Sequence, residues 1–207
     1  DNYIWTSNDS GATWVQNNSS NISGTTKNWM NIVSSSDGTK LVALIAGSDT
    51  IWTSNDSGVN WTQQTISETQ NFRGITMSAD GTKVAAVAYS GYIWTSSDSG
   101  ANWTKDTSVG ATKYWFDITS STDGTKLMAT NLNKDIWISN DSGATWNQDT
   151  SSPQVNWRGI TMSSDGTKLA AVEYGGGIWN STDSGVTWIR NPSFSQTPQW
   201  RAITSSD

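Results

Sequence analysis

The chain has 207 residues, a formal net charge of −6 at pH 7 and 34% hydrophobic residues. It contains no cysteine and no histidine, which excludes disulfide bonds, thiol chemistry and the commonest metal ligand and proton shuttle near neutral pH. An acidic chain without a basic patch is not expected to bind nucleic acid, and no apolar run is long enough to span a membrane.

In chain order, a pair of short strands is expected first, then four longer units and a final strand, all within one domain of residues 1–207. Each longer unit reads as four short strands, which we call A to D. Strand A ends at an Asp-Gly turn, as in WRGITMS, strand B is apolar, as in KLAAV, and strand C carries an Ile-Trp pair, as in GIWNS. The expected ranges are 1–17 (strands C and D), 28–65, 71–107, 114–150, 156–191 (complete units) and 199–207 (strand A).

Two turn sequences repeat along the chain. The first is Ser-x-Asp-x-Gly-x-Thr/Asn-Trp, called the Asp-Trp motif below, which connects strands C and D. The second is Asp-Gly-Thr-Lys, which connects strands A and B. Successive motif glycines are 42 to 47 residues apart, and four short strands per unit of this length are typical of a β-propeller blade. The motif residues are Asp9, Gly11, Trp14; Asp56, Gly58, Trp61; Asp98, Gly100, Trp103; Asp141, Gly143, Trp146; and Asp183, Gly185, Trp188.

All 14 tryptophans fall at three positions of the unit, namely strand A, strand C and the end of the Asp-Trp motif. Large aromatic residues at equivalent positions fill the space between twisted sheets, so we expect them to form the core between blades.

The two ends of the sequence read as parts of one blade. Its strand A is expected at residues 199–207 and its strands C and D at residues 1–17, so this shared blade would lack its second strand, strand B. Three explanations stay open: a longer polypeptide, a strand donated by a partner chain such as a second copy, or a larger array of blades.

The Asp-Trp motif resembles the Asp-box, or BNR repeat, of sialidases, sortilin-type receptors and photosystem II assembly-factor propellers, and the five motifs cover nearly the whole chain. The resemblance implies an all-β propeller in which the motif is the turn between the third and fourth strands. The residue types agree, because Asp accepts backbone N–H bonds in turns and Gly reaches conformations that other residues adopt only at a cost. With one carboxylate per motif, neither a metal site nor a cofactor is expected.

Both repeated turns must lie on one face of the propeller, which leaves the variable D–A and B–C loops on the other. Loops on a rigid scaffold commonly carry function. Three arginines that follow the aromatic residue of strand A would present paired N–H donors to a carboxylate there, or would neutralise neighbouring turn acids and loop carbonyls. The candidate ligand-binding residues are Arg73, Arg158, Arg201, Tyr89, Glu173 and Tyr174.

Catalysis is not expected. The resemblance to sialidases would imply a Tyr nucleophile with a Glu partner, a separate Asp acid and three arginines. Glu173 and Tyr174 are adjacent, so on a strand their side chains would point apart. A sialidase-like glycosidase is therefore the last of three readings.

The first reading is a non-catalytic binding or assembly module, whose partner on the variable face is a protein or a glycan. The alternative is a structural repeat domain of an extracellular or particle-surface assembly that is joined by strand complementation. Only 14% of the residues are charged, which is common in secreted proteins, so we expect an extracellular or surface location. In that setting Asn17, Asn18 and Asn21 are the best N-glycosylation candidates.

Overall fold

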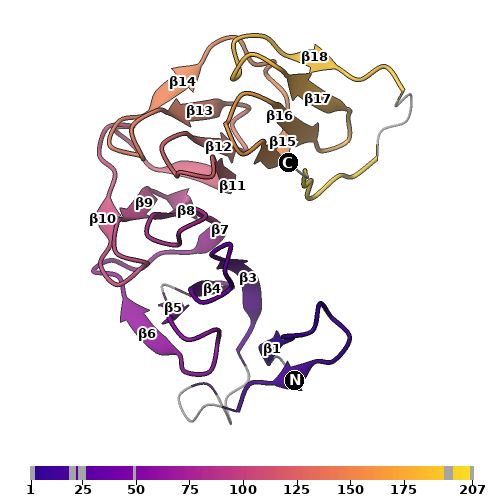
Figure 1. The fold of residues 1–207 in the computed structure, drawn as a ribbon. Coiled ribbons are helices and arrows are strands. Elements are labelled where there is room, and N and C mark those ends of the chain that lie inside the picture. Colours follow the sequence, from indigo (N-terminus) through magenta and orange to yellow (C-terminus); the bar gives the residue numbers. More distant parts are fainter. Residues whose placement is uncertain (1–2, 19–21, 23–26, 49, 194–197, 206–207) are drawn as a thin grey trace.

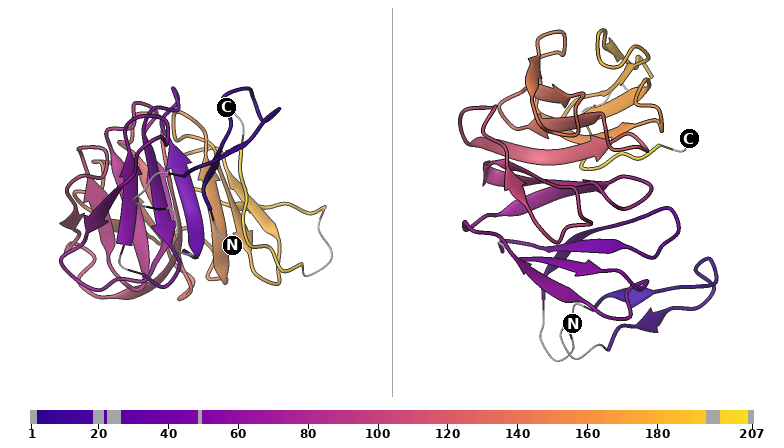
Figure 2. Two further views of the ribbon diagram at one scale, coloured as in Figure 1. Left: turned by 90° about the horizontal axis from the view of Figure 1, so that it is seen from below. Right: turned by 60° about the vertical axis from the view of Figure 1, so that its left-hand side comes forward.

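A computed structural model shows the chain as a series of twisted sheets that follow one another along an open arc (Figure 1). It describes residues 3–18, 22, 27–48, 50–193 and 198–205, and within these residues every regular element is a strand. Figure 2 shows the same arc from two further sides.

We number the sheet units as blades 1 to 5. Blade 1 contains β1 (Trp5–Thr6) and β2 (Val15–Gln16). Blade 2 contains β3 (Trp29–Ser34), β4 (Leu41–Ile45), β5 (Thr50–Ser54) and β6 (Thr62–Thr65). Blade 3 contains β7 (Phe72–Met77), β8 (Val84–Gly91), β9 (Ile93–Ser96) and β10 (Thr104–Lys105). Blade 4 contains β11 (Lys113–Ser120), β12 (Leu127–Asn131), β13 (Ile136–Ser139) and β14 (Asn147–Asp149). Blade 5 contains β15 (Trp157–Met162), β16 (Leu169–Glu173), β17 (Ile178–Ser181) and β18 (Ile189–Arg190).

Blades 2 to 5 are antiparallel meanders of four strands in chain order, which confirms the predicted four-stranded units. Strands β3, β7, β11 and β15 lie along the inner side of the arc, and β6, β10, β14 and β18 lie along its outer rim (Figure 1). Blades 3 and 4 are also joined edge to edge, because β8 is long enough to pair with β11.

The core lies between successive blades. Between blades 2 and 3, for example, Val42 and Leu44 of β4 pack against Phe72 and Ile75 of β7. The tryptophans of the interior blades fill these layers, and Trp61, Trp115 and Trp157 are completely buried. The same positions in blade 1 are different, since Trp5 and Trp14 are half exposed or more.

The Asp-Trp motif forms a tight hairpin turn whose two central residues, such as Ser142 and Gly143, have positive φ angles of 61° and 86°. The Asp141 carboxylate accepts the backbone N–H of Thr145 at 2.9 Å and its hydroxyl at 2.6 Å. These donors, with the Ser139 hydroxyl, lower the pKa of Asp141 from 3.8 to about 2. The Ser142 N–H donates to the Thr125 carbonyl of the Asp-Gly-Thr-Lys turn, so both repeated turns lie on one edge of the blade.

The two ends of the chain do not form one blade, contrary to the sequence-based expectation. Blade 1 lies at one end of the arc, and residues 198–205 lie beyond blade 5 at the other (Figure 1). The Ser205 hydroxyl is 3.1 Å from that of Thr161, as Ser120 is 2.8 Å from Thr76 between blades 3 and 4. Residues 198–205 therefore take the place of strand A of a following blade.

Candidate binding site

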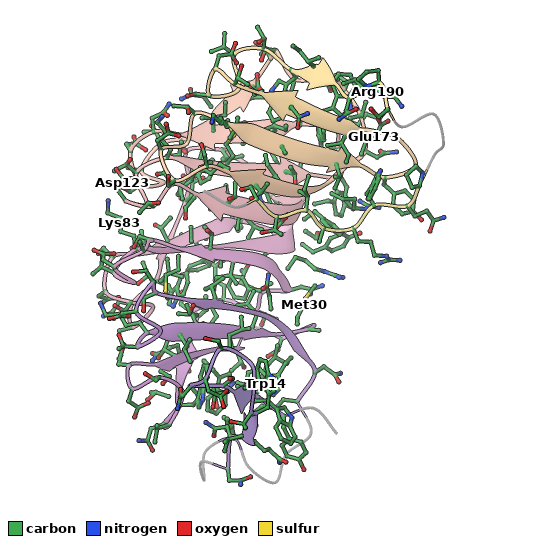
Figure 3. The ribbon with its side chains drawn as sticks, turned by 45° about the vertical axis from the view of Figure 1, so that its right-hand side comes forward. Trp14, Met30, Lys83, Asp123, Glu173 and Arg190 are labelled. Atoms are coloured by element: carbon green, nitrogen blue, oxygen red, sulfur yellow. The ribbon has the colours of Figure 1, made fainter. Side chains whose placement is uncertain are left out.

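The repeated turns and the variable loops lie on opposite edges of the arc. Figure 3 shows Lys83 and Asp123, from Asp-Gly-Thr-Lys turns, on one edge and Met30 and Glu173 on the other, which we call the variable edge.

Each inner strand carries a bulge where it leaves the variable edge. The pairing register shifts directly after the strand A aromatic, between Phe72 and Gly74 in blade 3 and between Trp115 and Asp117 in blade 4. A bulge re-aims the side chain of the extra residue. The residues at this position are Met30, Arg73, Phe116 and Arg158 in blades 2 to 5, and Arg201 by sequence in residues 198–205.

Arg158 lies between two aromatic rings from two blades. Its guanidinium carbon is 4.7 Å from the ring centre of Phe116 in blade 4 and 4.7 Å from that of Tyr174 in blade 5. Cations are attracted to aromatic faces at such distances, and the contacts also restrict the side chain's rotamers. Burial, with a smaller effect from the charge of Arg201, lowers the pKa of Arg158. The site therefore holds a partly desolvated cation in a defined orientation.

A second stack lies beside the first. The Arg73 guanidinium carbon is 5.2 Å from the ring centre of Tyr89, which is 5.2 Å from the ring centre of Tyr114. Within the described residues, the buried Nε of Arg73 has no hydrogen-bond acceptor. Tyr89 is also close enough to Arg158 to affect its pKa. We call this group the arginine-aromatic cluster; it consists of Arg73, Tyr89, Tyr114, Phe116, Arg158, Tyr174 and Arg201.

The sequence-based set of candidate ligand-binding residues included Glu173, but the structure does not place its carboxylate in this cluster. Its Oε2 accepts the Gly177 N–H and the Trp179 indole N–H, each at 3.4 Å, so the carboxylate belongs to its own B–C loop. Glu173 precedes Tyr174, and the alternation of side chains along a strand sends the two to different sides.

Sequence reasoning missed two members of the cluster, Tyr114 and Phe116. The available signal was the position of Phe116, which follows Trp115 as Arg158 follows Trp157. Tyr114 had no local signal, because its contact with Tyr89 depends on the pairing of β8 with β11.

Asn17 is not placed as a glycosylation site would be. It is buried, and its amide nitrogen, the atom that would carry a glycan, donates to the Gly58 carbonyl of blade 2. Asn18 is exposed, and Asn21 lies outside the described residues.

No group of three or more acidic residues among the described residues is arranged to hold a metal ion. In the same part of the chain, no helix is long and apolar enough to cross a membrane.

A buried carboxylate links blades 4 and 5 beside the cluster. Asp117 accepts the N–H of Ile118 at 2.9 Å and that of Ile160 in blade 5 at 3.0 Å. Burial raises its pKa from 3.8 to about 6 despite these two hydrogen bonds. The joint between blades 4 and 5 therefore contains a group that titrates in mildly acidic solution.

We expect Asp117 to make stability fall as the pH rises. A folded-state pKa above the unfolded value means that the folded protein holds the proton more tightly, so this contribution is complete below pH 3.8 and is lost as the pH passes about 6. Urea unfolding of the wild type and Asp117→Asn between pH 4 and pH 7 should show the wild type losing up to about 3 kcal/mol relative to the variant. A difference between them that is constant over this range would contradict the assignment.

No protein-family model matches the sequence, and no curated protein matches it. Solved β-propeller structures do match. YCF48 bound to D1 peptide gives a TM-score of 0.64 at 16% identity, covering 87% of this chain and 58% of that one. A chain of the nidogen–laminin complex gives 0.69 at 14%, covering 87% and 69%. The GH74 xyloglucanase from Xanthomonas campestris gives 0.66 at 16%, covering 86% and 33%. The TM-scores establish a shared β-propeller fold, and the chain spans little more than half the length of the YCF48 structure with D1 peptide.

Proposed function

We propose that this chain is a non-catalytic binding module, and that the arginine-aromatic cluster binds a carboxylate group of a partner protein. The observation that carries the proposal is the stacking of Arg158 between Phe116 and Tyr174. Within the described residues, no carboxylate lies within salt-bridge distance of Arg73, Arg158 or Arg201. Three cations that have no acidic partner in the described part of the chain are suited to receive one from outside.

The chemistry of the cluster favours a carboxylate. A guanidinium forms two parallel N–H···O bonds with a carboxylate, and a planar group already held between rings loses little conformational freedom on binding. Partial burial of Arg158 strengthens such a contact relative to one in open water. The half-exposed Tyr114 offers an apolar face at the margin of the cluster for the rest of the partner.

The proposal includes an assignment of the Asp-Trp motif to the Asp-box repeats and an extracellular or surface location. The hydrogen bonds of Asp141 within its own turn support a structural role for the motif, away from the binding edge. Protein recognition is supported by the neighbours, since YCF48 was solved with a D1 peptide and nidogen in a complex with laminin.

The non-catalytic part of the proposal rests on the carboxylates. Glycoside hydrolysis ordinarily uses two carboxyl groups that flank the scissile bond. Among the described residues next to the cluster, the two acids are Glu173, which is bonded to its own loop, and Asp117, which is bonded to two backbone N–H groups between blades.

The test uses acetylated Glu-Glu and Gln-Gln dipeptides as probes, with binding followed by NMR of the ¹⁵N-labelled protein. We expect saturable shifts with the Glu-Glu probe alone, and binding about tenfold weaker in Arg158→Ala. Arg190→Ala is the matched control, because it removes the same charge from β18 and should bind like the wild type. Equal weakening by both variants would reduce the effect to net charge and contradict the proposal. Binding of sialyllactose but not Glu-Glu would identify a glycan partner instead, and hydrolysis of a fluorogenic sialoside that is lost in Arg158→Ala would identify an enzyme.

A further inference from the structure

Three side chains of blade 4 contact the segment of β15 that carries Arg158, where β11 and β12 lie beside β15 (Figure 1). The ring of Phe116 lies against the Arg158 guanidinium. The hydroxyl of Thr130 in β12 donates to the Arg158 carbonyl at 2.8 Å. Asp117 in β11 accepts the N–H of Ile160, two residues further along β15, at 3.0 Å. Blade 4 therefore fixes the backbone of blade 5 at Arg158 and directly after it.

Thr130 occupies a position that is aliphatic in the other complete blades. It is the residue of strand B that pairs with the isoleucine of strand C, and the equivalent residues are Leu44, Val87 and Val172. Thr130 is as fully buried as these three. A hydroxyl at such a position costs free energy unless it is hydrogen-bonded, and the Arg158 carbonyl is the acceptor that satisfies it.

Asp117 also differs from its equivalents. It directly precedes the isoleucine of strand A and lies opposite Thr130 in the pairing of β11 with β12. Blades 3 and 5 have glycine and valine at these two positions, namely Gly74 with Val87 and Gly159 with Val172. The blade fold therefore requires neither a carboxylate nor a hydroxyl there.

We propose that Asp117 and Thr130 are positioning residues for Arg158, which fix its backbone so that the guanidinium lies between Phe116 and Tyr174 in the orientation that receives a carboxylate. Both contacts are made to backbone atoms of β15, so they determine where the long side chain of Arg158 begins. A binding group that is held in place before the ligand arrives loses less conformational freedom on binding. The role of the pair in ligand binding rests on the proposed function, whereas the positioning itself is a property of the free protein.

The first measurement uses the free protein and needs no ligand. In the ¹⁵N-labelled chain, the Nε–H signal of Arg158 is identified by its absence in Arg158→Ala, and its chemical shift reports the ring currents of Phe116 and Tyr174. Thr130→Val keeps the shape and removes the hydroxyl, so the signal should move toward that of the exposed Arg190. Thr130→Ser keeps the hydroxyl and removes a methyl group, so the signal should stay near its wild-type position.

Binding of the acetylated Glu-Glu dipeptide should follow the same order. We expect it to be about tenfold weaker in Thr130→Val and close to the wild type in Thr130→Ser. Thr76→Val is the matched control, because it removes a hydroxyl that lies 2.8 Å from that of Ser120 at the joint between blades 3 and 4. It should leave both the Arg158 signal and the affinity unchanged.

Asp117→Asn separates positioning from charge. At neutral pH the variant keeps the size of the side chain but loses a negative charge and one acceptor oxygen. An effect through charge alone would strengthen the binding of an anion to the neighbouring arginines, whereas loss of positioning should weaken it. Unchanged or tighter binding would overturn the role of Asp117.

Two results would overturn the role of Thr130. They are an Arg158 signal that does not move in Thr130→Val, and equal weakening of binding by Thr130→Val and Thr130→Ser, which would follow packing rather than the hydroxyl. An Arg158 signal that moves as expected in a protein that does not bind the dipeptide would support the positioning and contradict the proposed function.

Discussion

Replacing Trp61 with alanine is expected to lower the free energy of unfolding by about 3–5 kcal/mol, whereas the same replacement of Trp14 should cost less than about 0.5 kcal/mol. Both residues end an Asp-Trp motif. Trp61 is completely buried beside Ile4 and Trp52, and its indole N–H donates to the Gly58 carbonyl at 3.0 Å. Trp14 is 60% exposed, so its removal leaves no cavity.

Urea denaturation followed by far-ultraviolet circular dichroism measures this difference, and it avoids a fluorescence signal that both variants alter. Because both tryptophans end the same motif and differ in burial, comparing the two variants separates the contribution of burial to the free energy of unfolding from that of the motif. Comparable losses in both variants would show that the motif tryptophan stabilises its own hairpin, and that packing against the neighbouring blade contributes little.

The second large effect is expected at Gly143. Its φ angle is 86°, and a Cβ atom there would lie 2.6 Å from Cγ2 of Thr95, which belongs to blade 3. Gly143→Ala should therefore combine a left-handed backbone cost of about 1–2 kcal/mol with about 1–3 kcal/mol of overpacking.

The matched control is Gly110→Ala. Gly110 has a similar φ angle of 80°, and a Cβ atom there would have no neighbour within 4 Å. It should lose only the backbone part, about 1–2 kcal/mol. Thermal unfolding of the two variants measures the difference. Equal midpoints would mean that blade 3 yields to the added methyl group, and that close approach of the turn to the preceding blade is not required.

Trp61 and Gly143 belong to the edge of the repeated turns and to the packing between blades, which hold the arc together. The proposed binding site lies on the opposite, variable edge. The repeated turns carry carboxylates that are occupied by their own backbone, as Asp141 is. The bulge positions vary from blade to blade, with Met30, Phe116 and, in the remaining cases, arginine. Changing them leaves the apolar layers between blades in place, since those layers consist of other residues.

Local chemistry in the sequence was sufficient to predict the strands, their order within a blade and the two turns. Asp141 accepts hydrogen bonds from Thr145, and Gly143 supplies the positive φ angle of the turn, so their spacing within one motif is enough to predict the hairpin. The buried position of Trp115 could be predicted for a similar reason, because a repeat places equivalent residues in equivalent layers.

The outcomes that differed from expectation depend on residues far apart in the chain. Asn17 is buried because its amide reaches Gly58 in the next blade, 41 residues away. Phe116 joins the cluster because blade 4 lies beside Arg158 of blade 5, and Glu173 is outside it because its carboxylate accepts the N–H groups of Gly177 and Trp179. The arrangement of the blades has the same origin. The repeat length specifies a blade, whereas the placement of one blade against the next comes from side-chain packing at each joint, such as that of Val42 and Leu44 against Phe72 and Ile75, between residues far apart in the chain.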